Sequence, residues 1–155
     1  MAEKSLSERL AESKGQPIEY EGRAVHASYH REVHSGDVLF VRFIKSAGEA
    51  RQGLSISLKK GALRVNEQSL RDVVLWKDTA PELVEIVCQT PKQGAVLSVW
   101  NAWDRSGILQ AWLRNAGMLV EEQDDAVILR CSDGVGPPDF GDLVVELKFV
   151  CPHKN

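Results

Sequence analysis

The sequence LVEIVCQTPKQGAVLSVW, residues 83–100, contains the pattern that decides the fold. Residues 83–88 and 95–100 are two runs rich in Val, Ile and Leu, and each run is too short for a typical helix. The segment between them, Thr90-Pro91-Lys92-Gln93-Gly94, has the composition of a turn. The stretch therefore predicts two short β-strands separated by a turn.

Similar short runs occupy most of the chain. Residues 25–30 and 54–58 alternate apolar with polar side chains, as expected of strands with one solvated face. Residues 38–44 are almost continuously apolar, which predicts a strand buried on both faces. Further runs occur at residues 63–65, 73–76, 126–131 and 143–150. Roughly eight to ten short strands separated by turns predict an all-β fold, an antiparallel β-sandwich of jelly-roll type.

The N-terminal residues differ from this pattern. Residues 3–14 have the spacing of a short amphipathic helix, because Ser5 and Glu8 form a capping-box pair while Leu6 and Leu10 share one face. A helix of this length is marginal on its own, so we expect residues 1–16 to be either a docked helix or a frayed tail. Residues 17–155 are predicted to form a single β-sandwich domain, since the chain length fits one domain.

One internal segment, residues 108–117, fits two structures. Ile108 and Trp112 have helical spacing, and Gly117 stands where a helix C-terminus would need it. The same residues also alternate as a strand would. The strand is favoured, because strands flank the segment on both sides and connections in such folds are short.

Composition and charge exclude several classes of partner. The net charge is -3, with residues 1–77 carrying 13 basic and 10 acidic side chains and residues 78–155 carrying 6 and 12, so no basic stripe for nucleic acid is present. No run of 18 apolar residues predicts a membrane span. The sequence Met1-Ala2-Glu3-Lys4-Ser5 lacks the features of a secretory signal, and Cys88, Cys131 and Cys151 match no disulfide framework, which favours the cytoplasm.

A metal enzyme has little support in the sequence. His26, His30 and His34 would share a helical face, but on a strand residues four apart lie about 13 Å from each other, too far for ligands of one ion. A cupin-like metal enzyme would need these histidines to converge with a carboxylate inside a barrel. The cluster Cys151-Pro152-His153 lacks the fourth ligand that a structural zinc site needs.

The tryptophans suggest a ligand site. Three of the four lie between residues 100 and 112, among amides and charged groups. Flat indole faces beside such groups suit stacking on a sugar ring, with amide and carboxylate bonding its hydroxyls. A core role fits Trp103 least, because it adjoins the turn-like segment 104–107. The predicted ligand-binding residues are Asn101, Trp103, Asp104, Trp112 and Asn115.

An acidic, glycine-rich loop precedes the last predicted strand. Asp133, Asp139 and Asp142 are spaced along residues 133–142, and carboxylates in such a loop can converge on calcium, a hard cation that prefers oxygen ligands. The alternative is a solvated turn whose aspartates cap local backbone N–H groups.

At this loop the chain resembles a family. Asp139-Phe140-Gly141-Asp142-Leu143-Val144 resembles the end of the pattern G-D-x-D-[YF]-N-D-L-V, which leads into the last strand of some bacterial calcium-dependent adhesin-like and lectin-like β-sandwich domains. The resemblance implies calcium-holding roles for Asp139 and Asp142. The chain departs from the pattern at Gly141, where the family has Asn, and at Pro137, where it has an acidic residue.

Two functions of different classes follow from these patterns. The first is a noncatalytic recognition module that binds a small molecule or glycan, with carbohydrate as the leading ligand class and calcium as a candidate cofactor. The second is an intracellular protein-protein interaction or assembly protein, including a homo-oligomer, because sandwich edges and exposed aromatic residues also form interfaces.

Overall fold

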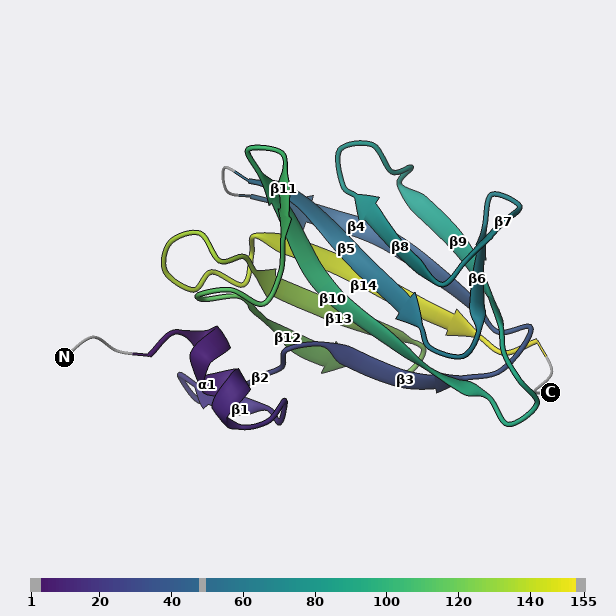
Figure 1. Cartoon of the computed structure of the whole chain (residues 1–155), viewed down its shortest axis with the longest axis horizontal. Coiled ribbons are helices and arrows are strands. Elements are labelled where there is room, and N and C mark those ends of the chain that lie inside the picture. The colour runs from purple at the N-terminus through teal and green to yellow at the C-terminus, as the bar shows by residue number, and fades with distance from the viewer. Residues whose placement is uncertain (1–3, 48–49, 153–155) are drawn as a thin grey trace.

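The computed structural model describes residues 4–47 and 50–152. Two antiparallel sheets pack face to face, and a small hairpin and a short helix lie together at one end (Figure 1). This arrangement confirms the all-β sandwich with a short N-terminal helix that the sequence predicts.

The five-stranded sheet is built around a long central strand. Its members are β3 (Tyr29–Val33), β5 (Arg51–Leu58), β8 (Asp72–Trp76), β10 (Ala95–Arg105) and β11 (Ile108–Gln110). Strands β8, β5 and β10 are neighbours in that order. Both β3 and β11 pair with the other edge of β10, β3 along residues 95–99 and β11 along residues 103–105.

The seven-stranded sheet forms the second layer. In spatial order its members are β12 (Gly117–Glu122), β13 (Ala126–Ser132), β14 (Leu143–Val150), β4 (Val38–Ser46), β9 (Leu83–Gln89), β6 (Ala62–Val65) and β7 (Gln68–Leu70). A β-bulge shifts the register between β14 and β4 at Val144 and Val145. Such bulges bend a strand and increase its twist, which helps a wide sheet curve over its partner.

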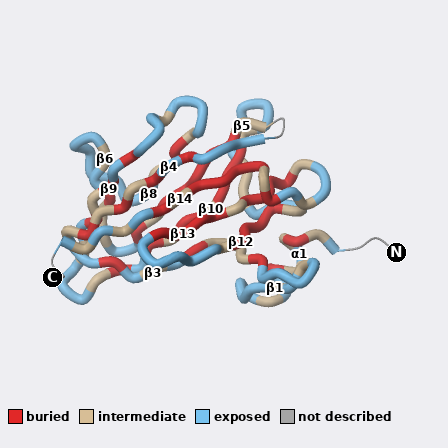
Figure 2. Tube along the Cα trace, turned by 180° about the vertical axis from the view of Figure 1, so that it is seen from behind, coloured by how far each residue is buried: buried red, intermediate tan, exposed pale blue. Residues whose placement is uncertain are grey.

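The main core lies between the two sheets. Figure 2 shows the buried residues concentrated along the strands in the middle of the sandwich. On β5, Leu54, Ile56 and Leu58 belong to this core, while Ser55 and Ser57 occupy the alternate positions, as the sequence pattern predicts.

The prediction that residues 38–44 are buried on both faces is wrong. On β4, Leu39 and Val41 are buried, whereas Arg42 and Ile44 are exposed. The physical reason is that an antiparallel sheet of a two-layer sandwich has only one covered face, so an apolar run does not imply a covering layer on both sides.

The N-terminal segment docks as a second, smaller core. Helix α1 (Leu6–Glu12) begins at the Ser5–Glu8 capping box, and β1 (Ile18–Tyr20) pairs with β2 (Arg23–Val25). The helix buries Leu6 and Leu10 against the hairpin and the sandwich, in a cluster completed by Val25, Leu119 and Phe140. The N–H of Ser7 also donates to the carbonyl of Arg114 at 2.7 Å. Of the two alternatives for this segment, the docked helix is therefore the one observed.

The ambiguous segment 108–117 contains no helix. The predicted strand is found at residues 108–110, as β11, whereas residues 111–116 form an irregular loop and Gly117 begins β12. Trp112 and Arg114 in this loop have φ angles of 57° and 52°. Such left-handed conformations interrupt a strand, which is why the strand pattern does not continue. No helix among the described residues is long and apolar enough to cross a membrane.

We predict that Leu10→Ala releases α1 from the sandwich. Leu10 is 5% exposed in the small core, and truncating a buried leucine costs about 2–4 kcal/mol. Hydrogen exchange of the α1 amides should accelerate strongly, while amides of β5 and β10 stay protected because the main core is untouched. Glu12→Ala, an exposed change on the same helix, is the matched control. Unchanged exchange in α1 of the Leu10→Ala variant would contradict this packing.

Candidate ligand-binding face

The outer face of the five-stranded sheet carries an unusual set of side chains. Core residues alternate along its strands, so every second residue points away from the core. The outward positions of the three central strands are Asp72, Val74 and Trp76 on β8, Gly53, Ser55 and Ser57 on β5, and Ser98, Trp100 and Ala102 on β10. Small residues thus lie between two half-buried tryptophans, of which Trp100 also packs against the main core.

A third tryptophan joins this face from the loop after β11. The indole of Trp112 stacks on that of Trp100, with ring centroids 4.8 Å apart and an interplanar angle of 28°. Trp112 is 49% exposed. We call Trp76, Trp100 and Trp112 the tryptophan face.

Trp112 is held in place at a conformational cost. Its φ of 57° lies in the left-handed region, which is unfavourable for a residue with a bulky side chain. Two contacts offset this cost: the stacking on Trp100, and a hydrogen bond of 3.0 Å from the indole N–H to the carbonyl of Ala27. The exposed indole is therefore positioned by the surrounding structure rather than free to rotate.

Trp76 packs closely over Gly53, where an added side chain would force the indole to move. A Cβ added at Gly53, the cross-strand partner of Trp76, would lie 2.8 Å from the indole Cε3. The Arg51 guanidinium lies 4.5 Å from the centroid of the same indole and also bonds both carboxylate oxygens of Asp78, at 2.8 and 2.9 Å. The indole of Trp76 is therefore fixed between the sheet and a positively charged group.

A row of polar side chains crosses the sheet beside the tryptophan face. His30, Ser98, Ser57 and Asp72 are successive cross-strand partners on β3, β10, β5 and β8. The ring of His30 is hydrogen-bonded to Ser98 at 2.9 Å, and Ser57 donates to Asp72 at 2.5 Å. Strands lie about 4.8 Å apart, so this polar row spans roughly 14 Å. It offers donors and acceptors to a molecule lying along the tryptophans.

Two of the five predicted ligand-binding residues are not on the surface. Trp103 is fully buried and donates its indole N–H to Gln110 at 3.1 Å, while Asn101 is buried and donates to the carbonyl of Ser132 at 2.9 Å. Odd-numbered residues of β10 point inward, so both side chains lie in the interior and do not reach a ligand on this face. Gly134 completes the packing, because a Cβ there would lie 2.6 Å from the Trp103 ring.

Asp104 and Asn115 mainly stabilise loops. Asp104 lies at the end of the outer face opposite Arg51 and accepts a hydrogen bond of 2.8 Å from the N–H of Gly107 in the β10–β11 turn. Asn115 accepts from the N–H of Leu6 at 3.3 Å and donates to the carbonyl of Gly136 at 3.1 Å. Of the five residues, Trp112 therefore lies on the tryptophan face, and Asp104 lies at its margin.

Trp76, Trp100 and the polar row were not in the predicted site. A usable pattern was present, because Leu97 and Val99 are core-type residues and their alternation assigns Trp100 to the opposite face. No comparable pattern links Trp76 to Trp100, since their proximity depends on strand β5 lying between β8 and β10.

The acidic loop uses its carboxylates inside the protein. Asp133 is buried, and its two carboxylate oxygens accept hydrogen bonds from Gln52 at 2.7 Å and from the N–H of Val135 at 2.9 Å. Asp142 is also buried and accepts from the N–H of Asp133 at 3.1 Å. Asp139 is exposed and caps the N–H of Gly141 at 2.9 Å. The bonds to backbone N–H groups match the capping part of the alternative, but Asp133 and Asp142 are buried, so the loop is not the solvated turn of that alternative.

Burial in this loop shifts the pKa of one carboxyl group. Burial raises the pKa of Asp142 to about 7, and the negative charges of Asp133 and Asp139 act in the same direction. The N–H of Asp133 opposes them by stabilising the charged form. In the described part of the chain, no three His, Cys, Asp or Glu side chains are arranged to hold a metal ion. The calcium site at Asp133, Asp139 and Asp142 stays a prediction that rests on the sequence.

The histidines and cysteines do not form a common site in the described residues. His26 forms a β-bridge with Met118, His30 lies in the polar row, and the His34 ring lies 3.8 Å from Glu32. Cys88 and Cys131 are separate buried thiols, and burial raises the pKa of Cys88 to about 11. The cluster at Cys151 extends to His153, which lies outside the described residues.

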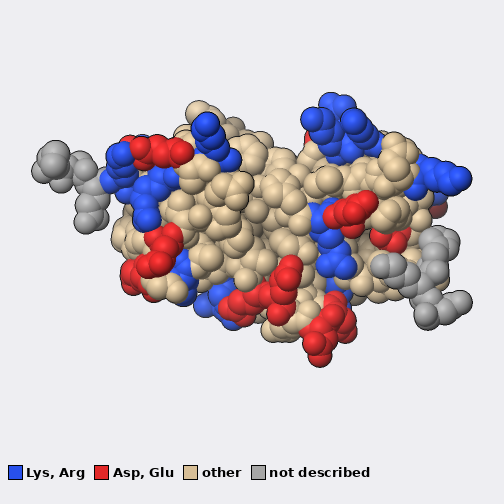
Figure 3. Space-filling view, turned by 90° about the horizontal axis from the view of Figure 1, so that it is seen from below, with Lys and Arg blue, Asp and Glu red and all other residues tan. Residues whose placement is uncertain are grey.

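Charge is mixed on the side of the molecule that includes α1 and β3. Figure 3 shows basic and acidic side chains interspersed there rather than gathered by sign.

Comparisons with protein-family models, with curated proteins and with solved structures found no match to this chain.

We predict that Asp142 makes folding less favourable as pH rises toward 7. The folded-state pKa of Asp142 lies above its usual value of 3.8, so the unfolded chain releases this proton first as pH rises, and folding becomes less favourable between about pH 4 and 7. Asp142→Asn removes this effect and should raise the free energy of unfolding at pH 8 by about 1–2 kcal/mol, after allowance for solvent screening.

Urea unfolding at pH 5 and pH 8 measures the effect. The gain from Asp142→Asn should shrink at pH 5, where wild-type Asp142 is protonated. Asp139→Asn, an exposed change in the same loop, is the control and should show a much smaller gain. An Asp142→Asn variant that is less stable than wild type at pH 8 would refute the raised pKa.

Proposed function

We propose that the protein is a noncatalytic carbohydrate-recognition module and that the tryptophan face is its binding surface. The observation that carries the proposal is the exposed indole of Trp112, stacked on Trp100 on the outer face of a β-sheet and held there in a left-handed conformation. A conformation of this kind persists only where the surroundings impose it, and such positions are frequent in ligand sites.

The chemistry beside the indoles supports a sugar as the ligand. Sugar rings have apolar faces formed by C–H groups and hydroxyls around their edges, so they need both an aromatic surface and hydrogen-bonding groups. The polar row lies one pleat away from Trp100, at about 7 Å along β10, and offers the hydroxyls of Ser57 and Ser98 with the imidazole of His30. Its length across the sheet suits an oligosaccharide rather than one sugar.

A second candidate function is favoured by a separate observation. Close to Trp112 in the sequence, Leu109 and Leu113 are each about half exposed, and Leu109 lies opposite Asp104 on the outer face of the sheet. Clustered exposed apolar residues mark protein interfaces, and tryptophan is enriched in their centres. This patch supports the alternative of an interaction or assembly protein, including a homodimer. The unpaired cysteines support its placement in the cytoplasm, a reducing compartment.

We predict that Trp112→Ala weakens binding to a neutral polysaccharide by about tenfold or more, because it removes the exposed indole and its stack on Trp100. Affinity electrophoresis in gels containing a panel of soluble polysaccharides identifies a ligand, and calorimetry with the matching oligosaccharide gives the affinity. The control is Leu83→Ala, which removes an exposed apolar side chain from β9 in the other sheet.

The two candidate functions give different results. Retardation by a polysaccharide that is lost in Trp112→Ala and kept in Leu83→Ala supports the sugar site. Equal retardation of wild type and Trp112→Ala would refute the tryptophan face as the binding surface. A dimer in sedimentation that dissociates with Leu109→Lys, without binding to any polysaccharide, would favour the interaction protein.

A further inference from the structure

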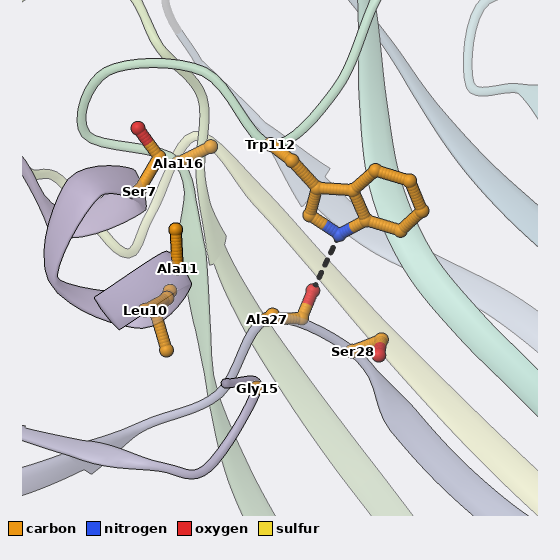
Figure 4. A pocket seen from close by; sticks show the side chains of 8 residues that line it. All are labelled: Ser7, Leu10, Ala11, Gly15, Ala27, Ser28, Trp112 and Ala116. Atoms are coloured by element: carbon orange, nitrogen blue, oxygen red, sulfur yellow. Dashed lines mark hydrogen bonds between the residues drawn. The ribbon is translucent and has the colours of Figure 1, made fainter. Parts of the chain in front are cut away.

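A cavity lies between helix α1 and Trp112. Its volume is about 280 Å³ (Figure 4). The helix contributes Ser7, Leu10 and Ala11, and the loop before β12 contributes Trp112 and Ala116. Figure 4 shows the helix side chains and the indole on opposite sides of the opening. The segment 27–28 provides a third wall. Because these segments are far apart in sequence, the cavity exists only when α1 is docked.

The lining determines the kind of ligand that fits. Most of the lining is apolar and small, with alanines at positions 11, 27 and 116. Its side-chain polar groups, apart from the indole N–H, are the hydroxyls of Ser7 and Ser28. No charged side chain is among the lining residues. Moving a charge into such a site without a partner is costly, so an uncharged ligand is favoured.

The walls are held in position before any ligand arrives. Trp112 donates to the carbonyl of Ala27 at 3.0 Å, which joins two walls directly. The N–H of Ser7 donates to the carbonyl of Arg114 at 2.7 Å, which joins the helix to the loop. Binding therefore costs little conformational entropy, because the walls are already ordered. Preformed apolar cavities of this kind are typical of small-molecule sites.

The volume sets the size of the ligand. A cavity of about 150 Å³ holds benzene. The cavity beside Trp112 has almost twice that volume, at about 280 Å³. It therefore has room for two fused rings, or for one ring with a short substituent, at roughly ten non-hydrogen atoms.

We propose that this cavity binds an uncharged, hydroxyl-bearing aromatic compound of bicyclic size. The rings contact Leu10 and Trp112, and the hydroxyl is hydrogen-bonded to Ser7 or Ser28. This site is separate from the proposed sugar site, because it depends on α1 and uses neither Trp76 nor the polar row. The two proposals share Trp112 as a wall, and the Ser28 hydroxyl of the cavity is hydrogen-bonded to the ring of His30 in the polar row at 2.8 Å.

The test titrates the full-length, ¹⁵N-labelled protein with naphthol and, as a charged control, with naphthoate. Naphthol should shift the NMR signals of the Trp112 indole N–H and of the amides of Ala11 and Ala116. Naphthoate should bind at least about tenfold more weakly, because its carboxylate has no partner in the cavity. Equal affinity for the two compounds would overturn the proposal, as would shifts centred on Trp76.

A cavity-filling variant locates the binding site. Ala11→Leu adds side-chain volume from α1 and should weaken naphthol binding by about tenfold or more. Glu12→Leu adds the same side chain to a neighbouring position outside the lining and should leave the affinity unchanged. If the spectrum of Ala11→Leu is not that of a folded protein, Ser7→Leu fills the cavity from the preceding turn. Undiminished binding to a folded cavity-filling variant would refute the site.

Discussion

The burial of strand β10 against the seven-stranded sheet is the constraint on which the rest of the structure depends. Leu97 and Val99 are fully buried between the sheets, and this fixes which side of β10 faces inward. Because side chains alternate along a strand, the same choice directs Asn101 and Trp103 into the interior and Trp100 outward. A shift of one residue in register would exchange the two sets.

The tryptophan face depends on small residues as much as on the indoles themselves. Gly53 and Ala102 are cross-strand partners on the outer face, and both are buried although they point away from the core. At Gly53 the covering side chain is Trp76. A larger residue at Gly53 would push the Trp76 indole away from the sheet, because an added Cβ would lie 2.8 Å from its ring. The tryptophan face is thus a property of three strands and one loop together.

The N-terminal helix links the two proposed sites. It packs through Leu6 and Leu10 on the small core, and it holds the loop 111–116 through the carbonyl of Arg114 and the side chain of Asn115. That loop in turn carries Trp112. The position of the exposed indole therefore depends on contacts made by a segment about a hundred residues away in sequence, and local opening of α1 would alter both surfaces.

The sequence by itself determined the class of fold, most strand positions and the helix cap. These features depend on local chemistry: β-branched runs, turn residues, and the Ser5–Glu8 capping pair, which is found as predicted. Only the tertiary structure decided which tryptophans are exposed and which aspartates are buried. Trp103 and Trp112 have similar polar neighbours in sequence, yet one is in the core and the other is half exposed. The physical reason is that burial depends on strand order and register, which bring Trp76, Trp100 and Trp112 to one face from separate parts of the chain.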